Sequence, residues 1–244
     1  MLYSQLGIQK GITAVIGSGG KTTLLSVLAQ ELPGTVLLCT STHIRPFAEA
    51  AQVLFEEDAG ADAAARIREA LDTNRIVCTG TKTADGKLTA PPVSFEELER
   101  MAAYVLVEAD GARSLPLKAH ASYEPVIPEN AARVICVAGA QGFGRPVKEV
   151  VHRPEIFCNM LNTQGTGEGG RDIPVTPDTI VTPQLAGALL RAEHPGDTLL
   201  INQAETEALR RQALECADAS GYTNCFTGSL KNMQFERREH GKNN

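Results

Sequence analysis

The sequence contains no tryptophan, and aromatic residues make up only 5% of its 244 residues. Proteins that bind single-stranded nucleic acid stack bases on aromatic side chains, so this composition argues against that class. Positive charge is also scarce, with 23 lysines and arginines against 29 acidic residues and a formal net charge of −6. Because the basic residues are not clustered, we expect neither a nucleic-acid surface nor an anionic-membrane surface.

Long apolar runs and paired cysteines are missing as well. No apolar stretch is long enough to span a membrane, and the first eleven residues lack a charged-then-apolar signal pattern. None of the six cysteines stands in a CxxC pair, and four lie in or beside apolar runs typical of strands. We therefore expect a cytoplasmic protein with reduced, buried thiols, with a metal or redox role for the cysteines as the alternative.

Apolar segments alternate with helical ones, which predicts an α/β fold with a doubly wound, mostly parallel sheet of the P-loop nucleotide-binding type. Strands are expected at residues 12–16, 35–40, 53–55, 75–79, 104–108, 133–138, 198–202 and 222–227. Helices are expected at residues 21–32, 61–72, 94–102, 154–161, 183–192 and 205–219. Asp85 and Gly86 predict a hairpin turn, and the glycine-rich residues 162–172 predict a loop. We expect a single domain over residues 1–230 and a polar C-terminal tail over 231–244.

The strongest motif lies between the first strand and the first helix and consists of Gly17, Ser18, Gly19, Gly20, Lys21, Thr22 and Thr23. Glycines let backbone N–H groups turn toward phosphate oxygens, and a helix N-terminus behind them favours anions. Lys21 is expected to reach the β and γ phosphates, and Thr22 to bind Mg²⁺. The full pattern GxxxxGK[ST] needs glycine where Val15 stands. The compact GxxGKT form resembles the ATP loop of Mur-type amide ligases and folylpolyglutamate synthases, so ATP is preferred to GTP.

Two carboxylates, Glu108 and Asp110, follow the apolar strand at residues 104–108. If the strand continues to Asp110, the two side chains lie on the same face of the sheet, because residues two apart in a strand point the same way. Ligands of doubly wound sheets bind outside the carboxyl ends of the strands. We expect both to act as ligands of the metal and of an attacking water, together with Thr22. Arg113 follows them and is a catalytic candidate for neutralising a transferring phosphoryl group.

Further residues are candidates for binding a second substrate, namely His43, Lys118, His152, Arg153 and Glu155. His43 follows the second strand, Lys118 follows the acidic strand, and the other three mark an expected helix start. Each also has a structural interpretation, as a solvated charge, a helix cap or a surface ion pair.

Asn202 and Glu205 stand where GTP-binding proteins carry an NKxD segment after a late strand. Gln203 occupies the lysine position and Glu205 the aspartate position, which weakens guanine-specific chemistry. We include Asn202 and Glu205 among the nucleotide-binding candidates without assigning GTP specificity.

Six segments in order, IGSGGKTTLL, TSTHI, VEADGARSLPLKAH, YEPVIP, VHRPE and LLINQAE, together resemble the YqeC-type accessory family of selenium-dependent molybdenum hydroxylases. The resemblance implies a nucleotide-dependent role in making or inserting a selenium-containing molybdenum cofactor. The matching positions are the loop from Gly17 to Thr23, Thr42, His43, Glu108, Asp110, Arg113, Lys118, Glu124, His152, Arg153 and Glu155. The segment from Asn202 to Glu205 departs from the NK.D ending usual in that family, so a base preference does not carry over.

Three functions remain open at this point. The chain can be a P-loop NTPase, or an ATP-dependent kinase or ligase, that uses Mg²⁺ and ATP or GTP. It can be a nucleotide-gated chaperone or insertase for a molybdenum hydroxylase. It can also be a non-hydrolysing module that grips the phosphate of a pterin-type cofactor.

Overall fold

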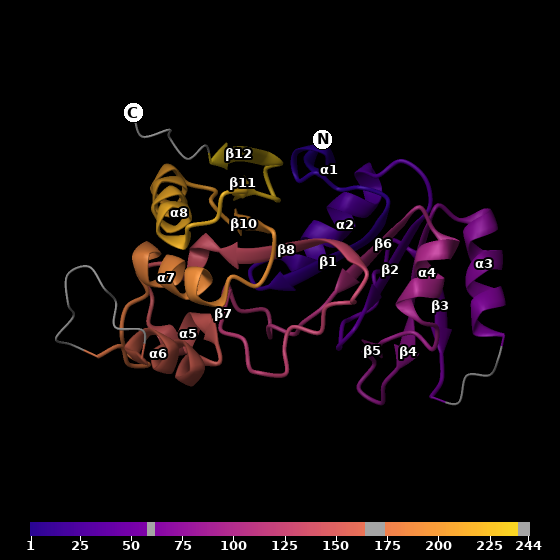
Figure 1. Cartoon of the computed structure of the whole chain (residues 1–244), viewed down its shortest axis with the longest axis horizontal. Coiled ribbons are helices and arrows are strands. Elements are labelled where there is room, and N and C mark those ends of the chain that lie inside the picture. The colour runs from indigo at the N-terminus through magenta and orange to yellow at the C-terminus, as the bar shows by residue number, and fades with distance from the viewer. Residues whose placement is uncertain (58–61, 164–173, 239–244) are drawn as a thin grey trace. The chain divides into compact units, whose positions relative to one another are not determined.

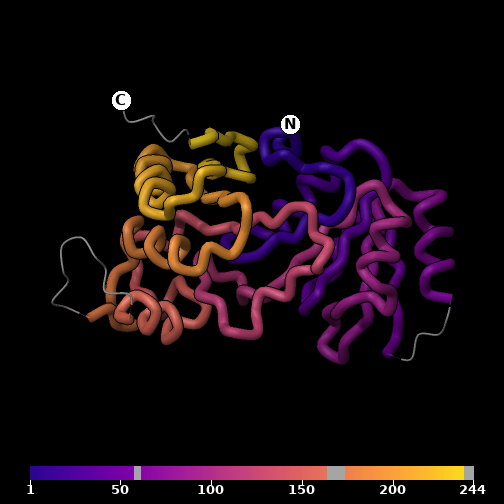
Figure 2. Tube along the Cα trace, viewed as in Figure 1, coloured from indigo at the N-terminus to yellow at the C-terminus, as the bar shows by residue number. Residues whose placement is uncertain are grey.

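The structure is a computed structural model that describes residues 1–57, 62–163 and 174–238. The fold is α/β with a mostly parallel central sheet, as predicted. The described chain falls into two compact units, whose paths can be followed by colour in Figures 1 and 2. The first takes in described residues of 1–16, 21–111 and 125–134, and the second those of 17–20, 112–124 and 135 onward. This division does not decide whether residues 1–230 form one domain, which stays a prediction.

The first unit is built around parallel strands in the spatial order β1 (Gly11–Gly17), β6 (Tyr104–Glu108), β2 (Val36–Thr40), β4 (Ile76–Lys82) and β3 (Ala51–Phe55). β2 and β6 are buried along their whole length. Their uninterrupted apolar sequences suit this burial, because a parallel strand inside a sheet is covered on both faces. β5 (Leu88–Thr89) pairs antiparallel with β4 and confirms the predicted hairpin.

Four helices belong to the described part of the first unit, α1 (Leu2–Gln5), α2 (Lys21–Glu31), α3 (Ala63–Thr73) and α4 (Phe95–Met101). α2 packs on β2 and β6, α3 packs on β3 and β4, and α4 packs on β6 beside α3 (Figure 1). The chain moves outward from β1 to β2 through α2, then returns from β3 through α3 and α4 to β6. Because parallel crossovers are right-handed, this reversal puts α2 on the opposite face from α3 and α4, which is a doubly wound arrangement.

The second unit carries the parallel strands β8 (Ala131–Gly139), β10 (Thr198–Asn202) and β11 (Cys225–Ser229), with β12 (Gln234–Arg238) antiparallel to β11. The first residues of β8, 131–134, belong to the first unit. A separate ribbon pairs β7 (Leu117–Lys118) with β9 (Val151–His152) in parallel. The described helical segments are η1 (Ala140–Gly142), α5 (Val147–Val150), α6 (Pro154–Thr163), α7 (Pro183–Glu193) and α8 (Glu207–Ser220).

α7 and α8 lie side by side in the second unit (Figure 1). Gly187 permits this approach, because a Cβ atom there would lie only 2.5 Å from the Cβ of Ala219. Thr182 caps the start of α7, since its hydroxyl accepts a hydrogen bond from the Leu185 N–H at 3.2 Å. Such a cap is worth about 1 kcal/mol of helix stability.

Several other expectations can be compared with the structure. All six cysteines are buried and free, as the interpretation of reduced thiols predicts. Within the expected polar tail, residues 234–238 form β12 on the edge of the sheet, a strand that was not predicted. The strand lacks an apolar pattern in the sequence because edge strands tolerate charged residues. Of the loop expected at 162–172, the first two residues end α6, and the rest lies outside the described residues.

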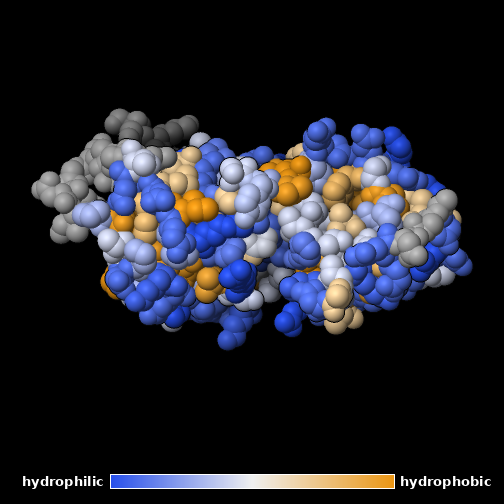
Figure 3. Space-filling view, turned by 90° about the horizontal axis from the view of Figure 1, so that it is seen from below, coloured by the Kyte–Doolittle hydropathy of each residue, from blue (hydrophilic) through white to orange (hydrophobic). Residues whose placement is uncertain are grey.

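The surface of the described chain mixes polar and apolar residues on the face drawn in Figure 3. Large apolar side chains that are exposed include Tyr123, Val126 and Ile180. Within the described residues, none of the helices combines the length and the apolar character that a membrane crossing requires.

Candidate functional site

The glycine loop adopts a backbone that only glycine accepts without strain. Gly17 and Gly19 have φ values of 87° and 86°, in the left-handed region. A Cβ atom at Gly17 would lie 2.3 Å from the Val137 carbonyl oxygen, and one at Gly19 would lie 2.5 Å from the Gly139 nitrogen. Both glycines are therefore required for the conformation and for the close packing of the loop against the β8 backbone.

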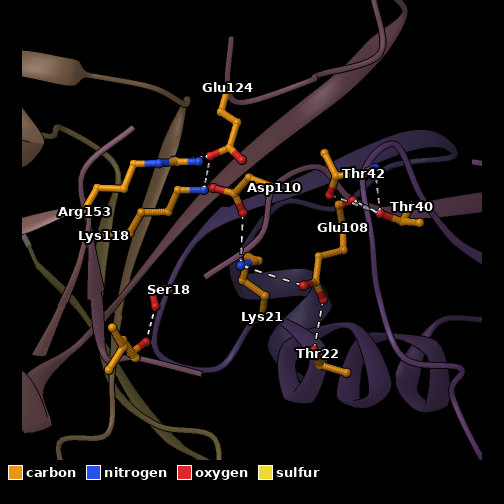
Figure 4. Close-up of polar contacts among 11 residues, drawn as sticks. Ser18, Lys21, Thr22, Thr40, Thr42, Glu108, Asp110, Lys118, Glu124 and Arg153 are labelled. Carbon is orange, nitrogen blue, oxygen red and sulfur yellow. Dashed lines mark hydrogen bonds and ion pairs between the residues drawn. The ribbon is translucent and has the colours of Figure 1, made fainter. Parts of the chain in front are cut away.

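Ser18 anchors this loop from within. Its N–H donates to the Val137 carbonyl at 2.8 Å, and its hydroxyl donates to the Leu115 carbonyl (Figure 4). Both polar groups of Ser18 therefore bond to backbone of the second unit. A direct contact of Ser18 with a nucleotide stays a prediction, and the structure gives the residue an anchoring role.

α2 begins at Lys21, directly after the loop, and its first turn has no acidic residue. The first four N–H groups of an α-helix have no partner within the helix, and the helix dipole adds positive potential there. Glycine loops followed by such a helix start are ready-made sites for phosphate. Thr23 lies in this first turn and is exposed, in a position compatible with its predicted phosphate contact.

Lys21 lies between the two predicted carboxylates of the first unit. Its Nζ is 3.0 Å from Oδ1 of Asp110 and 3.7 Å from Oε1 of Glu108 (Figure 4). The Lys21 side chain is 4% exposed and that of Asp110 is 0% exposed. β6 ends at Glu108, so Asp110 lies beyond the strand, yet both carboxylates contact one ammonium group, and their joint action on a metal or a water stays a prediction.

Thr22 completes the cluster, because its hydroxyl donates a 2.9 Å hydrogen bond to Oε2 of Glu108. Burial raises the pKa of Glu108, while the nearby Lys21 charge and the Thr22 hydrogen bond act in the opposite direction. Hydroxyl and carboxylate oxygens are the ligands that Mg²⁺ prefers, usually with phosphate oxygens and water filling the remaining positions. Among the described residues no three His, Cys, Asp or Glu side chains gather to hold a metal by themselves. Binding of Mg²⁺ by Thr22, Glu108 and Asp110 stays a prediction.

The end of β2 braces the carboxylate strand. The Thr40 hydroxyl donates to the Glu108 carbonyl at 2.7 Å and accepts from the Thr42 N–H at 2.9 Å. His43, which the sequence suggested as a substrate ligand, follows this segment and is exposed. The buried brace at Thr40 and Thr42 therefore fixes the backbone at Glu108, and the role of His43 stays a prediction.

Asn202 lies at the end of β10 and is only 4% exposed. Its Nδ2 donates to the Gly19 carbonyl at 2.8 Å, and its Oδ1 accepts from the Leu230 N–H at 2.8 Å. Both ends of the amide are thus engaged with backbone, one of them in the glycine loop. Glu205, the other predicted base-recognition residue, accepts from the Ser229 hydroxyl at 3.1 Å. Recognition of a base by either residue stays a prediction.

Lys118 and Arg153 meet on one carboxylate in the second unit. The Lys118 Nζ and the Arg153 Nη1 each lie 2.5 Å from Oε2 of Glu124 (Figure 4). His152 is the register partner of Lys118 in the β7–β9 ribbon. Of the remaining candidates, Arg113 is exposed with a φ of 49°, and Glu155 is exposed in the first turn of α6.

A further pair has no counterpart among the sequence-based candidates. The His120 Nδ1 lies 2.7 Å from Oε2 of Glu193, and the His120 N–H donates to the other oxygen of that carboxylate at 2.7 Å. His120 also lines a cavity with Leu117 and Phe157. The two partners are 73 residues apart, so no local pattern signals the pair.

Two comparisons with known proteins show the family of the chain. A family model described as YqeC protein matches residues 13–155, which include the glycine loop, Glu108, Asp110 and the Lys118–Glu124–Arg153 cluster. The protein YqeC of Escherichia coli (strain K12) is 34% identical over 205 residues. The aligned region covers 80% of this chain and 73% of that relative.

Proposed function

Because the chain belongs to the YqeC family, we propose that its glycine loop and acidic strand bind a nucleoside triphosphate with Mg²⁺ and cleave or transfer the γ-phosphate. The observation that carries the proposal is the triad in which Lys21 lies 3.0 Å from Asp110 while Thr22 donates to Glu108 at 2.9 Å. A lysine, a hydroxyl and a strand-end carboxylate after a glycine loop form the P-loop type of phosphate and magnesium site. ATP is our preferred nucleotide because of the compact GxxGKT loop, and GTP is the alternative.

The residues of the triad have distinct tasks in this proposal. Lys21 stabilises negative charge on the transferring phosphoryl group. Thr22 and Glu108 hold Mg²⁺, which when bound neutralises charge on the phosphate oxygens. Asp110 holds the Lys21 ammonium and orients the attacking nucleophile, while Arg113 neutralises a second anionic group.

The biological use of this reaction follows from the resemblance of the sequence motifs. We propose that the nucleotide serves the maturation or insertion of a selenium-containing molybdenum cofactor. A nucleotide-gated chaperone for a molybdenum hydroxylase is the alternative, for which the exposed β4–β5 hairpin is a candidate contact surface. A non-hydrolysing module for the phosphate of a pterin-type cofactor is the third reading of the same loop.

A substitution of Thr22 tests the proposed metal contact while keeping all three charged side chains of the cluster, Lys21, Glu108 and Asp110. Thr22→Val removes the hydroxyl and keeps the side-chain volume, and Thr22 lies on an exposed part of α2. We expect the variant to bind ATP about equally well with and without Mg²⁺, and to melt at a lower temperature because the buried Glu108 carboxylate loses a hydrogen bond. Thr22→Ser, which keeps the hydroxyl, should retain the Mg²⁺ enhancement of the parent. An unchanged Mg²⁺ enhancement in Thr22→Val would sink the assignment of this hydroxyl.

A further inference from the structure

The cluster around Glu124 is built by elements that hold two cations in fixed positions. The β7–β9 ribbon sets Lys118 opposite His152, and the Ala119 N–H donates to the His152 carbonyl at 3.0 Å. Arg153 follows directly, before the first residue of α6. One carboxylate oxygen of Glu124 then accepts from both Lys118 and Arg153.

Burial makes this arrangement rigid. The Lys118 side chain is 0% exposed, and that of Arg153 is 18% exposed. Arg153 is held further by Tyr123, whose hydroxyl accepts from Nη2 at 3.2 Å and whose ring lies 5.3 Å from the guanidinium carbon. Ordering two long cationic side chains costs conformational entropy and hydration free energy. A favourable interaction, such as binding of an anion, is needed to offset this cost.

Backbone strain is concentrated in the same unit. Six non-glycine residues of the described chain have a positive φ, and three of them are Arg113, Ser114 and Arg153. Left-handed backbone is unfavourable for a non-glycine residue because its Cβ atom crowds the following carbonyl oxygen. Such strain gathers at ligand clamps and active sites, where the surrounding structure enforces it.

The electrostatic potential at the His152 side chain is positive. Burial lowers the pKa of His152 first, and the charges of Arg153, Lys118 and Arg113 lower it further. Glu124 acts in the opposite direction but does not compensate them. An anion placed against this ring would therefore be attracted by the surrounding cations and would favour the imidazolium form.

We propose that His152 and Arg153 bind the tetrahedral oxyanion group of a second, small-molecule ligand of this protein, with the buried Lys118 ammonium and the charge of Arg113 adding positive potential to the site. Arginine and lysine are the side chains that recognise such groups, and Glu124 keeps the two buried cations in position for it. The oxyanion is either a free ion or the phosphate of an organic monoester. The inference rests on the proposed nucleotide reaction in that it names the chemistry of the second ligand. Binding of this ligand can nevertheless be tested in the absence of nucleotide.

Nuclear magnetic resonance titration of the histidines in the full chain tests this inference locally. The pKa of His152 is measured with sodium chloride, inorganic phosphate or glycerol 1-phosphate at equal ionic strength, because salt alone also screens the positive field. We expect a saturable rise in the His152 pKa with phosphate or its ester and none with chloride. The exposed His194, the C-cap residue of α7, should not respond.

Variants of Arg153 and Arg145 distinguish anion binding at the cluster from a general effect of protein charge. Arg153→Gln should weaken the His152 response about tenfold, since one charge-assisted contact is lost. Arg145→Gln, which removes an exposed arginine of the same unit paired with Glu149, should leave the response unchanged. If Arg153→Gln fails to fold, Arg153→Lys keeps the charge without the planar fork and should still weaken binding.

The outcomes are distinguishable. Equal affinity for both probes identifies a free oxyanion as the ligand, and tighter binding of glycerol 1-phosphate identifies an organic phosphate. A His152 pKa that responds equally to chloride and phosphate, or equally in the parent and Arg153→Gln, would reduce the cluster to a structural ion-pair network. Failure of the nucleotide proposal appears separately, as absence of ATP binding while the His152 response persists.

Discussion

The side-chain amide of Asn202 donates a 2.8 Å hydrogen bond to the carbonyl oxygen of Gly19, 183 residues earlier in the chain. The same amide accepts the Leu230 N–H at 2.8 Å, so one buried side chain connects the glycine loop with the end of β11. Asn202 therefore acts as a positioning residue for the loop, whatever it contributes to recognition of a base.

Removal of this amide should weaken nucleotide binding without removing a phosphate ligand. Asn202→Ala leaves two buried backbone groups without their partner, which should cost about 1–3 kcal/mol of stability. We expect a larger Kd for ATP in calorimetry and a lower melting temperature. Asn202→Asp, which can still accept from Leu230 but cannot donate to Gly19, should show the same loss of affinity.

Asn224 provides the matched control in the same unit. Its amide donates to the Thr198 hydroxyl at 2.7 Å, between β10 and β11. Asn224→Ala should lower the melting temperature and leave the Kd for ATP unchanged. Equal effects of Asn202→Ala and Asn224→Ala on that Kd would show that Asn202 acts through stability alone.

Gly19 should not tolerate a side chain. Gly19→Ala combines a φ of 86° with a Cβ atom 2.5 Å from the Gly139 nitrogen. Strain of this kind costs about 1–3 kcal/mol, and the loop must shift to relieve it. We expect lower stability in urea unfolding and loss of ATP binding.

Gly86→Ala is the control for Gly19→Ala, because it introduces backbone strain without a steric clash. It has a φ of 76° in the β4–β5 hairpin, and a Cβ atom there would meet nothing within 4 Å. Gly86→Ala should cost only the strain of a left-handed alanine, about 1–2 kcal/mol, and leave ATP binding intact. Retention of parental ATP affinity in Gly19→Ala would contradict the role given to the loop.

Glu124 should contribute stability that is lost in acid. Burial alone would raise its pKa, but hydrogen bonds from Arg153 and Lys118 outweigh this effect and lower the pKa to about 2. Since the folded-state pKa lies below the ordinary value of 4.5, the contribution is present above pH 4.5 and is lost as the pH falls toward about 2. The shift corresponds to at most about 3 kcal/mol, and solvent screening reduces this amount.

Urea unfolding between pH 2 and pH 7, a range that covers the fall from 4.5 toward about 2, checks this expectation. Glu124→Gln should be less stable than the parent at pH 7, and the difference should shrink as the pH falls. Glu129→Gln, at an exposed position of the first unit, should follow the parent curve. A constant difference between Glu124→Gln and the parent across this range would show that the carboxylate charge is not involved.

The regular elements could be predicted because their signals are local. β6 and β10 have the predicted bounds, since each is an uninterrupted apolar run with buried faces on both sides. β7 and β9 were not predicted, because two residues are too few to show a periodicity. β12 was hidden by the charges that an edge strand accepts.

For the candidate site as well, local features could be predicted from the sequence and long-range contacts could not. The sequence spacing of Glu108 and Asp110 is a local feature, and although β6 ends at Glu108, both carboxylates contact the same Lys21 ammonium group. The amide contacts of Asn202 and the His120–Glu193 pair join segments that are far apart in the sequence, so no local pattern encodes them. Long-range polar contacts of this kind depend on how the chain folds around them.

Calorimetric titration of ATP and GTP into the full chain, with and without Mg²⁺, tests the central claim most directly. The account predicts that at least one triphosphate binds with a Kd that falls markedly when Mg²⁺ is added, and that adenosine and guanosine, which lack phosphates, do not bind. Lys21→Ala should abolish this binding, while Lys10→Ala, at an exposed position of the same unit, should not. Absence of binding by both triphosphates, or equal ATP affinity in Lys21→Ala and the parent, would contradict the assignment of the glycine loop as a nucleotide site.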